Sequence, residues 1–144
     1  MSACIFCKIV RKELPSCIVA EEENVLAFMD IMPARKGHVL VTPKRHAEGM
    51  LDVAGQDLAA CLQMVQRICV AMQEAVHPPG FSVVQLNGAA AGQTVFHIHF
   101  HIIPRQAGDG IAMKWSHETY APGEIEQYRE KIAGVLKAQT TKLP

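Results

Sequence analysis

The fold of this chain is decided by an alternating stretch, HIHFHII at residues 97–103. Successive side chains of an extended strand point to opposite faces, so His97, His99 and His101 are predicted to share one face. The apolar residues between them then point to the other face, where they build a core. Three imidazoles on one face are costly to bury without partners, so this face is the first candidate for chemistry.

The segments around this stretch predict an antiparallel sheet. Extended patterns bounded by turn residues are expected at 17–22, 25–31, 38–43, 81–87 and 95–104. Apolar residues at steps of three and four predict one long helix over 56–76, and a closing helix is expected over 122–138. The predicted fold class is therefore α+β: a five-stranded antiparallel sheet with one long helix and a C-terminal helix.

Composition limits the class of protein. The chain has 144 residues, 49% of them hydrophobic, which suits one domain. Fourteen Lys and Arg balance fourteen Asp and Glu, so no basic field gathers counterions, and no nucleic-acid partner is expected. No apolar run reaches the ~18 residues of a membrane span, and the N-terminus lacks a secretory pattern. We therefore expect no membrane partner and predict a cytoplasmic location.

Two kinds of chemistry suit the histidine face. His-x-His pairs can chelate a metal ion and leave an open position that activates water. Alternatively, a neutral imidazole can attack phosphorus as a nucleophile. The loop at residues 87–95 contains small residues together with amide and hydroxyl donors, which allow a phosphate to approach closely. This loop favours the second kind.

A second motif, Cys4-x-x-Cys7, has the spacing of half a tetrahedral metal site. The chain contains five cysteines, an odd number in a chain too large and apolar for a disulfide-rich scaffold, so reduced thiols or metal ligands are favoured over disulfides. Spacing alone leaves a pair of free thiols as the alternative.

Together these motifs resemble the histidine triad (HIT) superfamily, in particular its bacterial HIT and Hint-like nucleotide hydrolases. The alternating stretch is similar to the signature of that family. Matching segments lie around it, in register over residues 4–105: residues 4–10, 26–31, 37–46, 87–95 and 104–105. The resemblance implies a single HIT domain over residues 1–144, with its core at 4–105 and a C-terminal helical tail at 106–144.

The resemblance also implies an activity: hydrolysis at the α-phosphorus of purine nucleoside phosphoramidates or related nucleotides, dinucleoside polyphosphates included, releasing a nucleoside monophosphate. By motif position His99 is the nucleophile, and water discharges the nucleotidyl-histidine. His38 and His101 lie beside it. An imidazole held in one tautomer suits in-line attack on phosphorus. A nucleotidyltransferase of the same superfamily and a nucleotide-binding regulatory protein are the alternatives.

The remaining site residues follow from the same resemblance. Asp30 would accept the ribose hydroxyls next to an aromatic platform, and loop donors would bond the phosphoryl or leaving-group oxygens. The implied nucleotide-binding set is Phe6, Ile9, Phe28, Asp30, Ile31, Asn87, Gly92, Gln93 and Thr94. His46 and His97 would join Cys4 and Cys7 in a closed, structural zinc site. A symmetric homodimer is implied as well.

Overall fold

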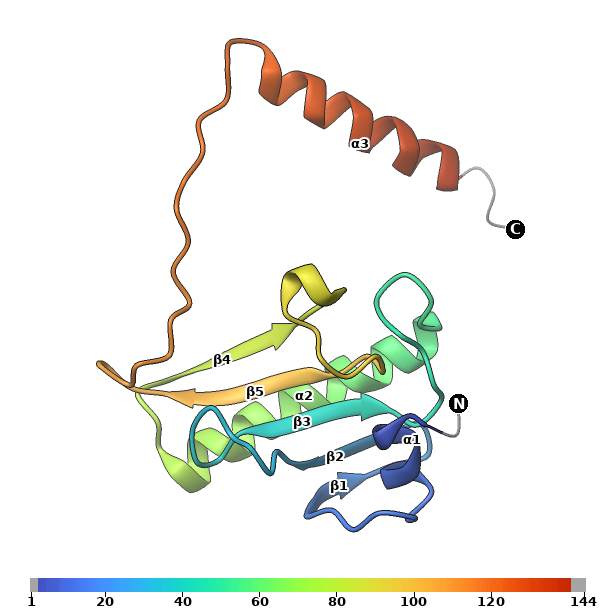
Figure 1. Cartoon of the computed structure of the whole chain (residues 1–144), viewed down its shortest axis with the longest axis vertical. Coiled ribbons are helices and arrows are strands. Elements are labelled where there is room, and N and C mark those ends of the chain that lie inside the picture. Colours follow the sequence, from blue (N-terminus) through green and yellow to red (C-terminus); the bar gives the residue numbers. More distant parts are fainter. Residues whose placement is uncertain (1–2, 141–144) are drawn as a thin grey trace. The chain divides into compact units, whose positions relative to one another are not determined.

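The computed structural model describes residues 3–140, which divide into two compact units, one ending at Ile111 and one beginning at Ala112. The first unit contains the sheet (Figure 1). In chain order its elements are α1 (Ile5–Val10), β1 (Ile18–Glu21), β2 (Val25–Met29), β3 (Val39–Pro43), α2 (Gly55–Val76), β4 (Gly80–Gln85), the 3-10 turn η1 (Ala89–Ala91) and β5 (Phe100–Arg105).

The five strands form one antiparallel sheet in the order β1-β2-β3-β5-β4. Consecutive strands pair at both ends of this order, and β5 inserts between β3 and β4. β3 and β4 are each antiparallel to β5 and therefore run parallel to each other, so α2 crosses over between them and covers one face of the sheet (Figure 1). The predicted α+β fold class is confirmed.

The main core lies between α2 and the sheet. Val41 and Ile102 have no solvent exposure and pack with buried residues of α2 such as Met64. The period of three and four in α2 puts these residues on one stripe, which explains why the helix forms where the sequence predicts it. Burying each such side chain stabilises the fold by roughly 1.5–3 kcal/mol.

The opposite face of the sheet carries α1 and a smaller core, in which Phe6 and Ile9 of α1 pack against Leu26, Phe28 and Leu40. Sequence patterns gave no sign of α1, because a six-residue helix is too short for a detectable period. Cys4 caps its N-terminus, its sulfur accepting a hydrogen bond from the Cys7 amide at 3.4 Å.

The predicted strand at 95–104 is wrong in its first half, since β5 begins at Phe100. Before that residue the backbone is held by separate hydrogen bonds instead of a ladder. The Ile98 amide donates to the Ala47 carbonyl at 2.8 Å, and the Ile98 carbonyl accepts from the Thr42 hydroxyl, also at 2.8 Å. His97 and His99 therefore precede the strand, and only His101 lies on it.

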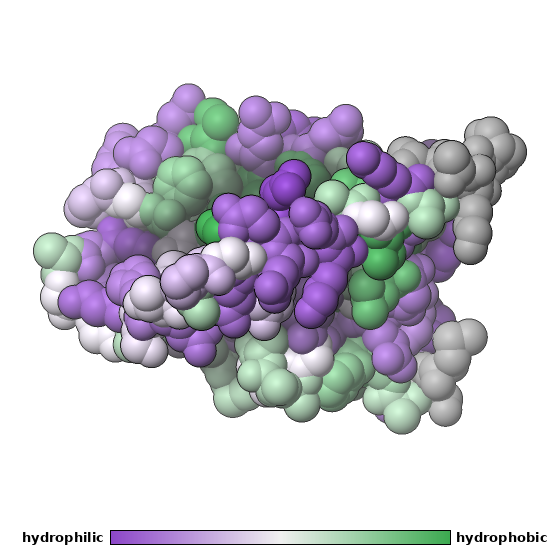
Figure 2. Space-filling view, turned by 90° about the horizontal axis from the view of Figure 1, so that it is seen from above, coloured by the Kyte–Doolittle hydropathy of each residue, from purple (hydrophilic) through white to green (hydrophobic). Residues whose placement is uncertain are grey.

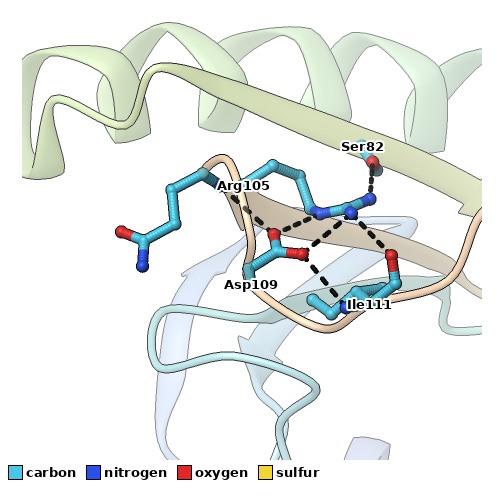
Figure 3. Close-up of polar contacts among 5 residues, drawn as sticks. Ser82, Arg105, Asp109 and Ile111 are labelled. Atoms are coloured by element: carbon cyan, nitrogen blue, oxygen red, sulfur yellow. Dashed lines mark hydrogen bonds and ion pairs between the residues drawn. The ribbon is translucent and has the colours of Figure 1, made fainter.

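At its other end β5 is fixed by Arg105 (Figure 3). The guanidinium donates to both carboxylate oxygens of Asp109, at 2.7 and 3.1 Å, and also to the Ser82 hydroxyl and the Ile111 carbonyl. The Arg105 contact, aided by backbone amides, holds the pKa of Asp109 well below its usual range. This Arg105–Asp109 pair ties the chain after β5 back to β4.

The second unit contains α3 (Glu124–Thr140), close to the predicted helix at 122–138. Glu124 accepts a hydrogen bond from the Ala121 amide at 2.7 Å, and the rings of Tyr120 and Tyr128 lie 6.0 Å apart. In the view of the whole chain in Figure 2, hydrophobic residues form separate patches among hydrophilic residues. Within residues 3–140, no helix combines the length and apolar character needed to cross a membrane.

Candidate functional site

The α1 side of the sheet brings together three imidazoles, which we call the imidazole cluster: His38, His99 and His101. His38 directly precedes β3, and His101 lies on β5 opposite Leu40 of β3. The His101 ring centre lies 4.8 Å from that of His99 and 5.1 Å from that of His38. His38 and His99 are buried, at 4% and 7% exposure. Residues distant in sequence thus form one cluster, as the resemblance implied.

The protonation of His99 is set by the backbone. Its Nδ1 lies 2.7 Å from the carbonyl oxygen of His97. A carbonyl can only accept, so Nδ1 carries the hydrogen and donates it. In the neutral ring Nε2 then carries the lone pair. His99 is held in the tautomer that a nucleophilic Nε2 requires.

The other two rings form a hydrogen-bonded relay that also starts from the backbone. The Ala34 amide donates to His38 Nδ1 at 3.0 Å, so this nitrogen carries no hydrogen. His38 Nε2 therefore donates to His101 Nδ1, at 2.9 Å. His101 in turn holds its hydrogen on Nε2. The cluster thus offers one basic nitrogen on His99 and one N–H donor on His101.

Burial keeps these rings neutral. Loss of hydration lowers the pKa of His38 and of His99, with weaker opposing contributions from Asp30 and, for His99, the His97 carbonyl. Desolvation and the neighbouring imidazoles lower the pKa of His101 to about 4. At neutral pH the lone pair of His99 is therefore available for chemistry.

Asp30 lies at the edge of this cluster, with one carboxylate oxygen 3.7 Å from His38 Nδ1. Its other oxygen accepts a hydrogen bond from the Met32 amide at 2.8 Å. Asp30, His38 and His101 are close enough together to hold a metal ion. Both nitrogens of His38 already take part in hydrogen bonds, however, so this group is better described as a hydrogen-bonded cluster than as a metal site.

An apolar wall borders the imidazoles. Phe6 meets His99 edge to face with ring centres 5.0 Å apart, and it meets Phe28 in the same way at 5.3 Å. Ile9 belongs to the same buried group. Ile31 follows the end of β2 and is 87% exposed. The structure therefore gathers three of the four predicted apolar residues in one buried group, of which Phe6 contacts His99.

The loop residues occupy a different position. The Gln93 amide accepts from the Gly88 amide at 2.7 Å and donates to the carbonyls of Glu48 and Val95. These bonds bury Gln93 and tie three segments together.

The other predicted residues of this loop lie nearer the surface. The Asn87 side chain accepts from the Met50 amide at 2.7 Å. Gly92 adopts the left-handed conformation that ends η1, with φ of 93°. Thr94 is exposed. The hydrogen bonds of Asn87 and Gln93 join loops and do not reach the imidazoles.

A second group, the Cys/His cluster, lies beside the first: Cys4, Cys7, His46 and His97. Its four ligand atoms lie within 4.8 Å of one another. His97 Nδ1 is 3.4 Å from the Cys4 sulfur and 3.5 Å from the Cys7 sulfur, and His46 Nδ1 is 3.4 Å from the Cys7 sulfur. None of the five cysteines, all within the described residues, forms a disulfide. This cluster could hold a metal ion.

The orientation of His97 fits a metal ligand. Its Nε2 lies 2.8 Å from the Pro43 carbonyl, so Nε2 carries the hydrogen and Nδ1 presents a lone pair to the two sulfurs. Burial lowers the pKa of His97, which keeps the ring neutral and able to ligate. Metal-bound histidines usually donate their second N–H to a carbonyl or carboxylate in this way.

Sequence reasoning missed the backbone groups that orient these rings, namely the carbonyls of Pro43 and His97 and the amide of Ala34. Every residue has such groups, so residue type carries no signal for them. The nearest sequence cue is a pair of prolines that restrict the local backbone, Pro33 before β3 and Pro43 as its last residue.

Comparisons with known proteins match most of the chain to one family. The family model of the HIT domain matches residues 11–108. The adenosine 5'-monophosphoramidase of Schizosaccharomyces pombe is 39% identical over 136 residues, which cover 94% of this chain and 99% of that protein. The crystal structure of a HIT family protein from Bacillus subtilis superimposes with a TM-score of 0.86 at 39% identity, covering 92% of this chain and 96% of that one.

A zinc-bound histidine triad family protein from Mycobacterium smegmatis is also similar, with a TM-score of 0.73 and 33% identity over 98% of this chain and 99% of that chain. The family model and these relatives together cover most of the chain. The chain belongs to the HIT family.

Proposed function

We propose that this protein is a nucleotide hydrolase that cleaves purine nucleoside phosphoramidates and related nucleotides, dinucleoside polyphosphates included, at the α-phosphorus. The observation that carries the proposal is the 2.7 Å bond from His99 Nδ1 to the His97 carbonyl. It leaves a neutral imidazole with its lone pair on Nε2, the atom that would attack phosphorus. The name of the Schizosaccharomyces pombe relative supports the same substrate class.

The reaction proceeds in two displacements. In the first, the Nε2 lone pair of His99 forms a bond to phosphorus. The bond from phosphorus to the leaving group breaks, and the leaving nitrogen keeps the electron pair and takes a proton from solvent. In the second, water attacks phosphorus, the electron pair returns to Nε2, and the water gives up its proton. The product is a nucleoside monophosphate.

His101 and His38 act on the charge of the phosphoryl group. The relay from the Ala34 amide leaves His101 with its hydrogen on Nε2, where it donates to a phosphoryl oxygen. A preorganised neutral donor stabilises charge that develops in the transition state without needing to reorient. His38 is a positioning residue, because it acts through His101.

The nucleoside binds beside this cluster. The Asp30 carboxylate accepts the ribose hydroxyls, and Phe6, Ile9 and Phe28 provide an apolar cleft for the base, which the exposed Ile31 closes. The exposed Thr94 bonds the phosphate or the leaving group, and Gly92, in its left-handed conformation, lets the loop turn beside it. Asn87 and Gln93 contribute by holding that loop, since their amides are bonded within it and to residues 48–50.

The Cys/His cluster is proposed to hold one structural zinc ion. Zinc lies about 2.3 Å from thiolate sulfur and about 2.0 Å from imidazole nitrogen, so a tetrahedral site places sulfur and nitrogen about 3.5 Å apart. The sulfur–nitrogen distances of 3.4, 3.4 and 3.5 Å in the cluster fit that requirement. Four protein ligands fill the coordination sphere, which excludes a water nucleophile at this ion.

The active form is proposed to be a symmetric homodimer in which the sheets of two subunits join. β4 is an edge strand of the sheet, and its Phe81 and Val83 are 43% and 44% exposed. An exposed edge with apolar side chains is a ready site for pairing with another strand. Light scattering that gives the mass of one chain at micromolar concentration would contradict this part of the proposal.

The decisive experiment is intact mass spectrometry after rapid quench of the protein with an adenosine phosphoramidate. We expect a transient increase of one adenylyl group in the wild type and none in His99→Ala. His77→Ala is the matched control, because His77 lies at the end of α2, away from the imidazole cluster, and should form the same adduct. Equal hydrolysis by His99→Ala would show that another group is the nucleophile.

A further inference from the structure

His97 takes part in both clusters through different atoms. Its Nδ1 faces the sulfurs of Cys4 and Cys7 at 3.4 and 3.5 Å, and its carbonyl oxygen accepts the 2.7 Å hydrogen bond from His99. Its Nε2 donates to Pro43, so the ring has no freedom to rotate while these contacts hold. Any shift of the His97 ring that moves its backbone also moves the acceptor that fixes the His99 tautomer.

The short helix α1 makes a second connection. Cys4 and Cys7 enclose Phe6 in the sequence, and the Phe6 ring contacts both His99 and Phe28. A helix of six residues is unstable alone, since nucleation costs more than so few hydrogen bonds return. The position of α1 therefore depends on its buried side chains and on the contacts of Cys4 and Cys7 with the histidines of the cluster.

From these two connections we infer that the Cys/His cluster is a positioning device for the nucleotide site: its occupancy by a metal ion strengthens nucleotide binding, through His97 and Phe6. The inference rests on the proposed function and goes beyond a structural role for the ion. Linkage then requires the reverse effect, so a bound nucleotide must raise the affinity of the cluster for its metal by the same factor.

The backbone between His97 and His99 is held in place by hydrogen bonds, so a movement at one histidine is passed to the other. Ile98, the residue between the two histidines, is fully buried and bonded through both its amide and its carbonyl, to Ala47 and to Thr42. Ala47 is the next residue in the chain after His46, which belongs to the Cys/His cluster. The metal ligands and the histidine backbone are thus joined by hydrogen bonds as well as by the chain.

The test measures adenosine monophosphate binding by calorimetry in zinc-loaded protein and in chelator-treated protein whose fold is checked by circular dichroism. We expect metal removal to weaken binding about tenfold, within the usual range of coupling between sites. In competition with a chelator, saturating adenosine monophosphate should raise zinc affinity by the same factor. Cys17→Ser is the matched control: Cys17 is exposed and outside the cluster, so its loss should leave both affinities unchanged.

A second readout needs no nucleotide. Solvent exchange of the His99 Nδ1 hydrogen can be followed by NMR, with its signal identified by its absence in His99→Ala. Exchange should be slow in loaded protein and faster after metal removal. Folded, metal-free protein with unchanged exchange and unchanged nucleotide affinity would overturn the inference. Loaded protein that binds no nucleotide but shows metal-dependent exchange would instead overturn the proposed function and support the positioning link.

Phe6→Leu covers the case in which metal-free protein unfolds. This variant keeps all four ligands and an apolar residue, and it removes the aromatic edge against His99. We expect zinc to be retained, adenosine monophosphate binding to weaken and kcat to fall less than KM rises. Full zinc content with wild-type nucleotide affinity would overturn the α1 connection.

Discussion

The imidazole cluster and the Cys/His cluster use the same side chain for opposite purposes, and the backbone decides which. In His97, Nε2 donates its hydrogen to the Pro43 carbonyl, so Nδ1 presents its lone pair to two sulfurs. In His99, Nδ1 donates its hydrogen to the His97 carbonyl, so Nε2 is the basic nitrogen. The two residues are separated by one position in the sequence. The difference teaches that the role of a histidine is set by the hydrogen bond that its other nitrogen makes.

The largest expected effect comes from removing the His99 imidazole, and it is an effect on catalysis. His99→Ala removes the proposed nucleophile, so kcat for an adenosine phosphoramidate should fall by about 10³-fold or more. The free energy of unfolding should fall by only a few kcal/mol, on the order of 1–3, because one hydrogen bond and the ring contacts with Phe6 and His101 are lost. Steady-state kinetics and urea unfolding measure the two quantities. A variant that loses stability in proportion to activity would show that His99 is mainly structural.

Substitutions in the Cys/His cluster should instead affect stability more than catalysis. Cys4→Ser combined with Cys7→Ser removes both sulfurs of the cluster, and the proposed zinc ion, in about thousandfold excess over its Kd, would contribute about 4 kcal/mol of stability. For a domain of this size we expect Tm to fall by roughly 10 °C. Calorimetry with metal analysis measures both. An unchanged Tm in zinc-free protein would show that the cluster contributes no stability.

The pH dependence of stability should separate the clusters further. Burial lowers the pKa of His101 from 6.5 to about 4, so between these values the unfolded chain binds the extra proton. The stabilisation from a neutral His101 is therefore complete above pH 6.5 and lost as the pH falls to about 4. At about 1.4 kcal/mol for each pKa unit, the loss between pH 6.5 and 4 is at most about 3.5 kcal/mol, and solvent screening at the partly exposed ring reduces it.

Urea unfolding at several pH values tests this, with His101→Gln as the control that cannot titrate there. The difference between wild type and variant isolates His101 from acid release of metal, because both proteins keep the Cys/His cluster. Parallel stability curves from pH 6.5 to 4 would contradict the assignment of a buried, neutral His101.

Much of the fold could be predicted from the sequence, but less of the site. The α2 helix and the five strands follow from repeating apolar patterns, and the predicted helix at 56–76 differs from α2 by one residue at its start. The strand at 95–104 was predicted too long because alternation of His and apolar residues continues before Phe100, where the hydrogen bonds go to Ala47 and Thr42 instead. Pattern alone cannot show which partner a backbone group finds.

The site divides in the same way. The three imidazoles and the four metal-ligand candidates are brought together as the resemblance implied. Gln93 differs from the expectation in its surroundings, since its amide bonds Glu48, a residue on a loop far away in the sequence. An amide in a glycine-containing loop suits a phosphate donor and a loop brace equally well, and only the folded contacts distinguish the two.

The relay from Ala34 through His38 to His101 should have a smaller effect than the nucleophile. His38→Ala leaves His101 free to hold its hydrogen on either nitrogen, so we expect kcat to fall roughly 10- to 100-fold with KM nearly unchanged. His38→Gln supplies an amide that can accept and donate, and it should restore part of the activity. Equal activity of both variants would show that the relay does not orient His101.

The smallest effect on activity is expected at the Arg105–Asp109 ion pair (Figure 3). Arg105 is the last residue of β5, at the opposite end of the strand from His101. Asp109→Asn keeps the size of the side chain and removes the charge that faces the guanidinium. We expect a decrease in Tm smaller than that caused by zinc loss, with kcat and KM unchanged. The pair lies away from both clusters, and Ser82 and Ile111 still accept from Arg105. A fall in kcat with no change in Tm would mean that this end of β5 is coupled to the imidazole cluster, which would contradict the confinement of catalysis to the other end.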